Sequence, residues 1–160
     1  MRAEILASNR VNRPVTSAFR AMASDRELFD ELSFYTLAHP DPGFIHQLSV
    51  DAYTAQHAEA ATKPIAVVFA LIGLYLHLEK NFTGKQVQRA HMKMARQRKQ
   101  WPRLPLPEKH AAVTVADVMA AAPGAERDAR IEAWCAAVWA VWEKSRDAIV
   151  RIAKTELDVE

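Results

Sequence analysis

The segment from Pro64 to Leu78 constrains the fold most, because a helix with this sequence is apolar on nearly every side. Such a helix is stable in water only when other helices surround it. The run contains no Asp, Glu, Lys or Arg, but it is shorter than the ~20 residues that a helix needs to cross a bilayer. We therefore predict a buried central helix at about 64–80 and no membrane span.

Cap signals and apolar spacing predict further helices on both sides of this segment. The cap signals are Ser24 with Glu27, Asp41 with Pro42, Thr62 with Pro64, Thr83 with Gln86, and Thr114 with Asp117. The predicted helices span 25–38, 42–59, 64–80, 84–100, a short stretch that ends before Pro123, and one long Trp-rich C-terminal helix at 126–157. We expect the tryptophans of this last helix in the core: Trp134, Trp139 and Trp142.

The composition of the chain also favours helix over sheet. The 160 residues include only four glycines, and strong helix formers are concentrated in the central segments. We predict an all-α, single-domain bundle of five to six helices over residues 24–160. Residues 1–23 are weakly patterned, and we expect an N-terminal arm or weakly ordered segment there.

Cysteine usage limits the possible chemistry. Cys135 is the single cysteine, which excludes an intrachain disulfide and a metal centre built from several thiolates of one chain. This usage fits a reducing cytoplasm, and the N-terminus lacks the apolar region of a secretory signal, so we expect a cytoplasmic protein. No P-loop, dinucleotide-binding glycine pattern, H-E-x-x-H motif or nucleophile elbow occurs, and we predict no cofactor.

Polar chemistry concentrates in the helix predicted at 42–59, which contains the string IHQLSVDAYTAQH. His46, Tyr53 and His57 lie on one face of this helix, away from its broader apolar face. A rise of ~1.5 Å per residue separates His46 from His57 by ~16 Å, too far for both to bind one metal ion. We predict a ligand-binding site or polar network, and no metal site, at these residues: His46, Asp51, Tyr53, His57 and His77.

Three side-chain pairings are open within this set. Two of them join i, i+4 neighbours that can share hydrogen bonds: Gln47 with Asp51, and Tyr53 with His57. If the helices at 42–59 and 64–80 form an antiparallel hairpin, His77 returns level with His46, with Glu79 beside it. The alternative interpretation is that these are buried polar residues satisfied separately by neighbouring helices.

Charge is segregated along the chain. Residues 80–107 contain eight Lys or Arg and no Asp or Glu, so the rest of the chain carries −6 against a total of +2. The predicted basic face consists of Lys85, Arg89, Lys93, Arg96 and Lys99. Such a face binds phosphates or an anionic surface, or it is solvated and pairs with acidic residues elsewhere in the chain.

The string VDAYTAQH at residues 50–57 resembles the VDAYxxQH core of an uncharacterised bacterial family, one of the domains of unknown function. The similarity extends over about residues 25–152. Many members of that family begin with a CPGCG-type cysteine knuckle, which this chain lacks. The resemblance implies that the site includes His46, Asp51, Tyr53 and His57, and it implies no reaction.

Three functions remain open. The leading hypothesis is a ligand-binding or interaction protein rather than an enzyme, with a small molecule or a second copy of the chain as partner. The first alternative is a divalent-metal-dependent enzyme of the helical-bundle type, which requires ligands from three helices within ~2.0–2.2 Å of the metal. The second is a binder of an anionic partner through the basic helix at 84–100, with nucleic acid as the less favoured form of that partner.

Overall fold

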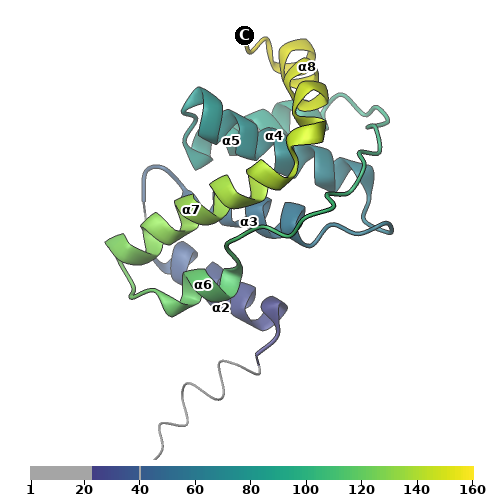
Figure 1. The fold of residues 1–160 in the computed structure, drawn as a ribbon. Helices are drawn as coiled ribbons and strands as arrows, with labels where there is room; N and C mark the ends of the chain where they lie inside the picture. Colours follow the sequence, from purple (N-terminus) through teal and green to yellow (C-terminus); the bar gives the residue numbers. More distant parts are fainter. Residues whose placement is uncertain (1–22, 40) are drawn as a thin grey trace, which may run out of the picture.

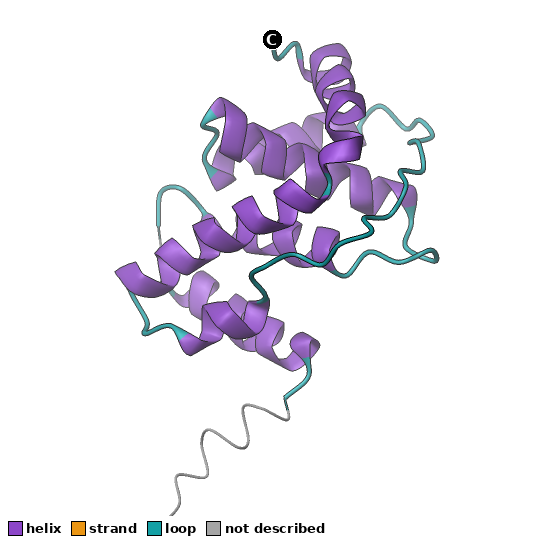
Figure 2. Cartoon of the chain, in the orientation of Figure 1, coloured by secondary structure: helices purple, strands orange, loops and turns teal. Residues whose placement is uncertain are grey.

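The computed structural model describes residues 23–39 and 41–160, so the arm expected at 1–23 lies outside the described residues except for Ala23. All regular secondary structure in the described residues is helical, and these residues form no strand (Figures 1 and 2). Its elements are α2 (Asp25–Ala38), α3 (Ile45–Gln56), α4 (Pro64–Lys80), α5 (Gly84–Ala95), α6 (Val115–Ala120), α7 (Ala125–Val141), the 3-10 helix η1 (Glu143–Ser145) and α8 (Arg146–Leu157). The all-α prediction is confirmed, although the described residues form seven α-helices rather than five or six.

Two helices form the centre of the structure. α3 contacts α2, α4, α5 and α7, while α4 contacts α3, α5, α7 and α8. Figure 1 shows α7 running across α3, with α2 and α6 at one end of the molecule and α8 at the other. The predicted central helix coincides with α4, which buries every residue from Ala70 to Leu76. Within the described residues, no helix has both the length and the apolar character needed to cross a membrane.

The predicted capping boxes are present at the starts of α2 and α5. The Ser24 hydroxyl accepts a hydrogen bond from the Glu27 amide at 3.2 Å, and the Glu27 carboxylate accepts one from the Ser24 amide at 3.3 Å. Thr83 and Gln86 form the same reciprocal pair at 3.2 and 2.8 Å. These bonds satisfy amides that have no partner within the helix, so both boundaries follow from local chemistry.

The starts of α3 and α4 differ from the predicted caps. α3 begins three residues later than expected, because Phe44 adopts a left-handed conformation (φ 53°) at the N-cap position. The carboxylate of Asp41 still accepts a hydrogen bond from the Ile45 amide, at 3.2 Å. At α4 the N-cap is Lys63 rather than Thr62, whose hydroxyl instead accepts a hydrogen bond from the Glu59 amide.

Two predicted helices end early. α3 ends at Gln56 instead of residue 59, and the basic helix α5 ends at Ala95 instead of residue 100. Arg98 has a left-handed backbone (φ 46°), which a continuing helix does not allow. The chain then continues without regular structure through three prolines as the α5–α6 segment (residues 96–114), the long loop visible in Figure 2.

The prediction of one long C-terminal helix is wrong. α7 ends at Val141, and η1 turns the chain before α8 begins at Arg146. The turn is closed by a hydrogen bond from the Ser145 amide to the Trp142 carbonyl at 2.9 Å, the i, i+3 spacing of a 3-10 helix. The change of direction lets α8 pack on α4 and α5 and bury Ile149. The apolar spacing runs through the break unchanged, and so it gives no sign of the turn.

The tryptophans of this region are largely core residues, as predicted. Trp134 and Trp142 are buried, and Trp139 is partly buried. Trp139 Nε1 donates a hydrogen bond to Glu79 at 3.0 Å, which joins the end of α7 to α4. Cys135 is buried beside them, and burial raises the pKa of its thiol well above the ordinary value.

A close backbone contact fixes the start of α5. The Lys85 amide donates a hydrogen bond to the Gly43 carbonyl at 2.9 Å, which ties α5 to the loop before α3. A Cβ atom at Gly84 would lie 2.0 Å from the Phe44 carbonyl oxygen. Only glycine allows this approach, so the small residue is required by the position of α5 against the loop.

We predict that Gly84→Ala lowers the free energy of unfolding by about 1–3 kcal/mol, since the backbone of α5 must shift to relieve the clash. Urea denaturation measures this difference. Gly43→Ala is the matched control, because its Cβ would meet only the flexible carboxylate of Asp41, at 3.1 Å. Equal effects of the two substitutions would contradict this explanation.

Candidate functional site

The polar face of α3 is turned toward α2. Each of its three residues contacts a different residue of that helix: His46 with Thr36, Tyr53 with Phe29, and His57 with Asp25. Because these contacts are spread along the full length of the α2–α3 interface, they do not form one centre. The face predicted to lie away from the main core therefore forms the interface with α2.

His46 lies at the start of this interface. Its Nδ1 is 2.9 Å from the hydroxyl oxygen of Thr36, which also donates a hydrogen bond to the Leu32 carbonyl within α2. Partial burial lowers the pKa of His46. A neutral His46 ring that donates through Nδ1 to the Thr36 hydroxyl satisfies this geometry and connects α3 to α2.

An aromatic stack occupies the other end of the interface. The ring of Tyr53 lies between the rings of Phe29 and His57, with centroid distances of 4.1 Å on both sides. Burial is the main cause of a raised Tyr53 pKa. The predicted association of Tyr53 with His57 is therefore a ring contact, not a hydrogen bond between the two side chains.

His57 is held through both ring nitrogens. Nδ1 lies 2.9 Å from the Tyr53 carbonyl oxygen, and Nε2 lies 2.9 Å from a carboxylate oxygen of Asp25. A carbonyl and a carboxylate can only accept hydrogen bonds, so both contacts are satisfied together when both nitrogens carry a proton. His57 thus links the end of α3 to the first turn of α2.

Asp51 points to the opposite side of α3, toward α4 and α5. The Gln47 amide nitrogen donates a hydrogen bond to Asp51 Oδ1 at 3.1 Å, as the i, i+4 spacing predicts. The same nitrogen lies 3.4 Å from Nδ1 of His91, and His91 Nε2 donates to the Phe69 carbonyl at 2.7 Å. Burial lowers the pKa of His91, so a neutral ring accepting through Nδ1 fits these contacts.

The carboxyl group of Asp51 is buried against the backbone of α4. A Cβ atom at Gly73 would lie 1.9 Å from Asp51 Oδ2, so the absence of a side chain there makes room for the carboxyl. Oδ2 is buried without a hydrogen-bond partner in the described structure, and it lies 3.9 Å from His91 Nε2. Burial raises the pKa of Asp51 well above its ordinary value, which favours the neutral acid.

His77 lies in a separate place and does not pair with His46. Its Nδ1 is 2.6 Å from the Phe82 carbonyl oxygen, and its Nε2 is 2.7 Å from the Glu132 carboxylate on α7. The hydrogen bond with Glu132 is the main cause of a raised His77 pKa. Glu79 does not assist His77, because its carboxylate pairs with Arg146 of α8 at 2.5 Å.

The three histidines of the predicted site are thus held apart, because two of them contact opposite ends of α2 and the third contacts α7. His46 meets α2, His57 meets Asp25 at the start of α2, and His77 meets α7. Across residues 23–39 and 41–160, no group of three or more His, Cys, Asp or Glu side chains is placed to hold a metal ion. The geometry of this part of the chain provides separate polar pairs.

A pocket of about 410 Å³ opens where α3 ends. We call it the α3 pocket, and the polar or aromatic residues that line it come from four segments: Asp25, Gln56, His57, Lys109, His110, Thr114 and Trp142. Leu106 and Pro107 supply much of its apolar wall. Among the described residues, Lys109 and His110 make no hydrogen bond or ion pair, so both are available to a bound molecule.

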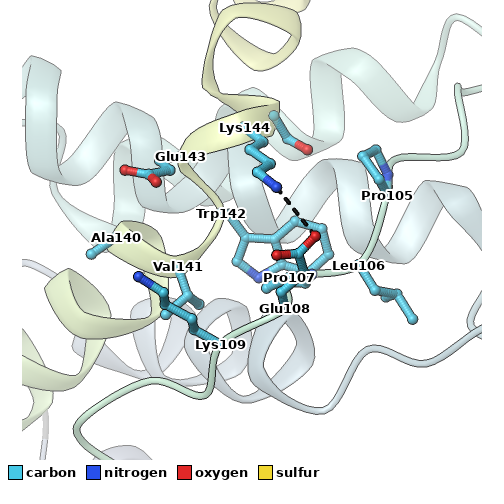
Figure 3. Close-up of a pocket in the computed structure, with 11 residues that line it drawn as sticks. Pro105, Leu106, Pro107, Glu108, Lys109, Ala140, Val141, Trp142, Glu143 and Lys144 are labelled. Carbon is cyan, nitrogen blue, oxygen red and sulfur yellow. Dashed lines mark hydrogen bonds and ion pairs between the residues drawn. The ribbon is translucent and has the colours of Figure 1, made fainter.

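A second pocket of about 280 Å³ adjoins the α3 pocket and shares Trp142 and Lys109 with it (Figure 3). An ion pair between Glu108 and Lys144, at 3.3 Å, joins the α5–α6 segment to η1 beside this pocket. The indole Nε1 of Trp142 is buried and has no hydrogen-bond partner in the described structure. An unpaired buried donor is uncommon, because it has lost its hydration without compensation.

Side chains rather than regular backbone bonds hold the α5–α6 segment over the pocket. Gln56 Nε2 donates to the Val113 carbonyl at 2.9 Å, while Gln56 Oε1 accepts from Trp134 Nε1 at 2.8 Å. Arg103 donates to the Ala60 carbonyl at 2.8 Å in the loop after α3. Gln56 therefore connects α3 to both α7 and the segment that forms the pocket wall.

The predicted basic face is exposed on α5 and in the residues after it. Lys93 lies 3.9 Å from an Asp158 carboxylate oxygen, and Lys99 pairs with Glu156, so part of the face is neutralised by the C-terminal residues. Lys85 lies over the ring of Phe44, at 5.6 Å from its centroid. Arg89 and Arg96 have no ion pair or hydrogen bond with the described residues.

Sequence reasoning missed His91, Lys109 and His110 as site residues. A signal for His91 exists: it lies three residues before the buried Met94 and four after the buried Val87, on the apolar side of an otherwise basic helix. The two loop residues offer no such signal, because their approach to His57 depends on the path of the α5–α6 segment.

We predict that Asp51→Asn changes how stability depends on pH. The folded-state pKa of Asp51 lies above the unfolded value, so ionisation costs the wild type stability as pH rises from about 4 toward the folded pKa. The asparagine variant lacks this loss. Its free energy of unfolding relative to wild type should therefore rise with pH, by at most ~1.4 kcal/mol per pH unit.

Urea denaturation of both proteins across this pH range measures the difference, in which the contributions of titrating groups far from Asp51 cancel. Asp147→Asn is the control, because this carboxylate is exposed and its variant should give a constant difference. A constant difference for Asp51→Asn as well would show that the carboxyl is ionised without cost in the folded protein.

Comparison with known proteins places this site within a family. Residues 20–143 match a family described as "Family of unknown function (DUF5946)". No curated protein and no solved structure matches the chain. The matched region includes α2 to α7 and every residue of the α3 pocket. It also includes Asp51 and the two residues beside its carboxyl group, Gln47 and His91. It covers more than half of the 160 residues, and the expected membership of a family of unknown function is confirmed. The chain belongs to DUF5946, a family of unknown function.

Proposed function

We propose that the protein binds a small organic molecule in the α3 pocket. The observation that carries the proposal is the convergence of α2, the end of α3, the α5–α6 segment and the end of α7 on one cavity of about 410 Å³. Ligand pockets in proteins typically have volumes of ~300–1,000 Å³ and combine apolar walls with a few polar groups. Leu106, Pro107 and Trp142 supply apolar walls. Lys109 and His110 supply polar groups that have no partner among the described residues.

Charge favours an anionic ligand. Lys109 lines the cavity and is not neutralised by any described residue, whereas Asp25 is already paired with His57. His110 adds a second free group that can donate a hydrogen bond. A small organic acid with an aromatic or aliphatic body matches this combination of a free cation and an apolar wall.

The separation of the histidines supports binding over metal-dependent catalysis. His46 and His57 contact opposite ends of α2 and His77 contacts α7, whereas a divalent-metal enzyme needs three ligands within ~2.0–2.2 Å of one ion. His57 is the member of this set that lines the α3 pocket. It is therefore the residue on which the ligand hypothesis can be tested.

We expect 1-naphthoate to bind more tightly than the neutral 1-naphthalenemethanol, as measured by saturation-transfer NMR titration. Lys109→Gln should remove this preference by weakening naphthoate alone. His57→Ala should weaken both probes, by about tenfold, because it removes part of the pocket wall. His39→Ala is the control: this histidine is exposed, bonds to the Tyr35 carbonyl and lies outside the pocket.

Thermal unfolding of the same samples separates ligand binding from architecture. The proposal requires that His57→Ala change probe affinity more than the unfolding temperature. If the substitution lowers the unfolding temperature and leaves both affinities unchanged, His57 serves only to join α3 to α2. Absence of binding by either probe to the wild-type protein would remove the proposed preference for aromatic acids.

A further inference from the structure

The outward face of α5 carries a line of cations that form no ion pair with the residues the structure describes. Lys85, Arg89, Met92 and Arg96 follow one another at spacings of four, three and four residues, so they lie along one side of the helix. Val87, Ala90 and Met94 are buried on the opposite side. The outward face therefore consists of three cations and one exposed methionine, and we call it the outer strip.

The C-terminal residues divide the basic face into a paired and an unpaired part. Lys93 faces Asp158, Lys99 pairs with Glu156, and Lys80 donates to the Glu160 carbonyl. The three cations of the outer strip form no ion pair with any residue in 23–39 or 41–160. A face that only keeps a protein in solution can carry acidic as well as basic residues. Residues 80–107 contain no acidic residue, which favours a binding role for this face.

An apolar pocket of about 280 Å³ lies next to the outer strip, between α5 and the C-terminal residues. Phe82, Leu157 and Val159 supply its apolar surface, and Arg89 and Lys93 lie at its edge. Arg89 belongs to both the strip and the pocket. A ligand with a flat ring in this pocket could therefore place an attached anionic group on the cations of the outer strip.

We propose that this surface binds single-stranded nucleic acid, with phosphates on the outer strip and a base in the pocket beside Phe82. Proteins that bind single strands without sequence preference combine a cationic track for the backbone with an aromatic or apolar surface for bases. Lys85 and Arg96 are ~16 Å apart along the helix, a distance that ~5 stacked nucleotides cover.

The geometry favours a repeating polyanion over a membrane. Helices that lie on anionic bilayers present a continuous apolar face beside their cations, and here the outward direction offers only Met92. The strip is linear and extends beyond the pocket at both ends, so a single lipid headgroup would use only part of it. No side-chain array for reading base edges is present on the strip, so binding should be tolerant of sequence.

Fluorescence anisotropy with a labelled oligothymidine of about 15 nucleotides tests the proposal on the full chain. Three phosphate contacts predict that log Kobs falls against log salt with a slope of about −2. The variant K85Q/R89Q/R96Q should bind at least about tenfold more weakly at 50 mM salt and lose most of this slope. These side chains are exposed, so the unfolding midpoint should stay unchanged.

The matched control K63Q/R130Q/R151Q removes the same charge from other exposed positions that form no ion pair with the described residues, and it should stay within about twofold of wild type. Asp158→Asn removes the ion-pair partner of Lys93 and should therefore tighten binding. The variant should keep its fold here, because asparagine also tolerates the left-handed backbone at this position (φ 55°). Equal losses for the two triple variants would overturn the proposal. So would the absence of oligothymidine binding, or tighter binding to vesicles containing phosphatidylserine.

Discussion

α3 is enclosed by α2, α4, α5 and α7, and the rest of the structure depends on this enclosure. A polar side chain on an enclosed helix must find its partner inside the protein, because a buried polar group left unpaired costs ~1–3 kcal/mol. Asp25 and Thr36 supply partners from α2, His91 supplies one from α5, and Trp134 supplies one from α7. The polar residues of the IHQLSVDAYTAQH string therefore orient the surrounding helices, and they do so in different directions.

The α3 pocket lies where this enclosure stops. Beyond Gln56 no helix continues, and the cavity is closed instead by the α5–α6 segment and the end of α7. The prolines of this segment remove backbone donors, so side chains such as Gln56 and Arg103 hold it in place. The wall of the pocket is thus built from irregular backbone, which allows its composition to vary with little effect on the helices beneath.

Local signals in the sequence predicted most of the helices, whereas the contacts between distant residues could not be predicted from it. Capping boxes such as Ser24 with Glu27 involve residues three apart, and their geometry is nearly independent of the rest of the fold. The break at Trp142 depends on where α8 must pack, and the apolar spacing passes through it unchanged. Likewise, α3 was identified as the polar helix, but the partner His91 lies on a helix whose composition suggested only a basic surface.

The contact between Asp51 and Gly73 has an evolutionary consequence. Because a methyl group at position 73 would overlap the Asp51 carboxyl, Gly73 cannot be replaced without disturbing the α3–α4 interface while that acid is present. A larger residue at position 73 becomes acceptable only after position 51 has been shortened. Substitutions at the two positions are therefore expected in a fixed order, with the replacement of Asp51 preceding that of Gly73.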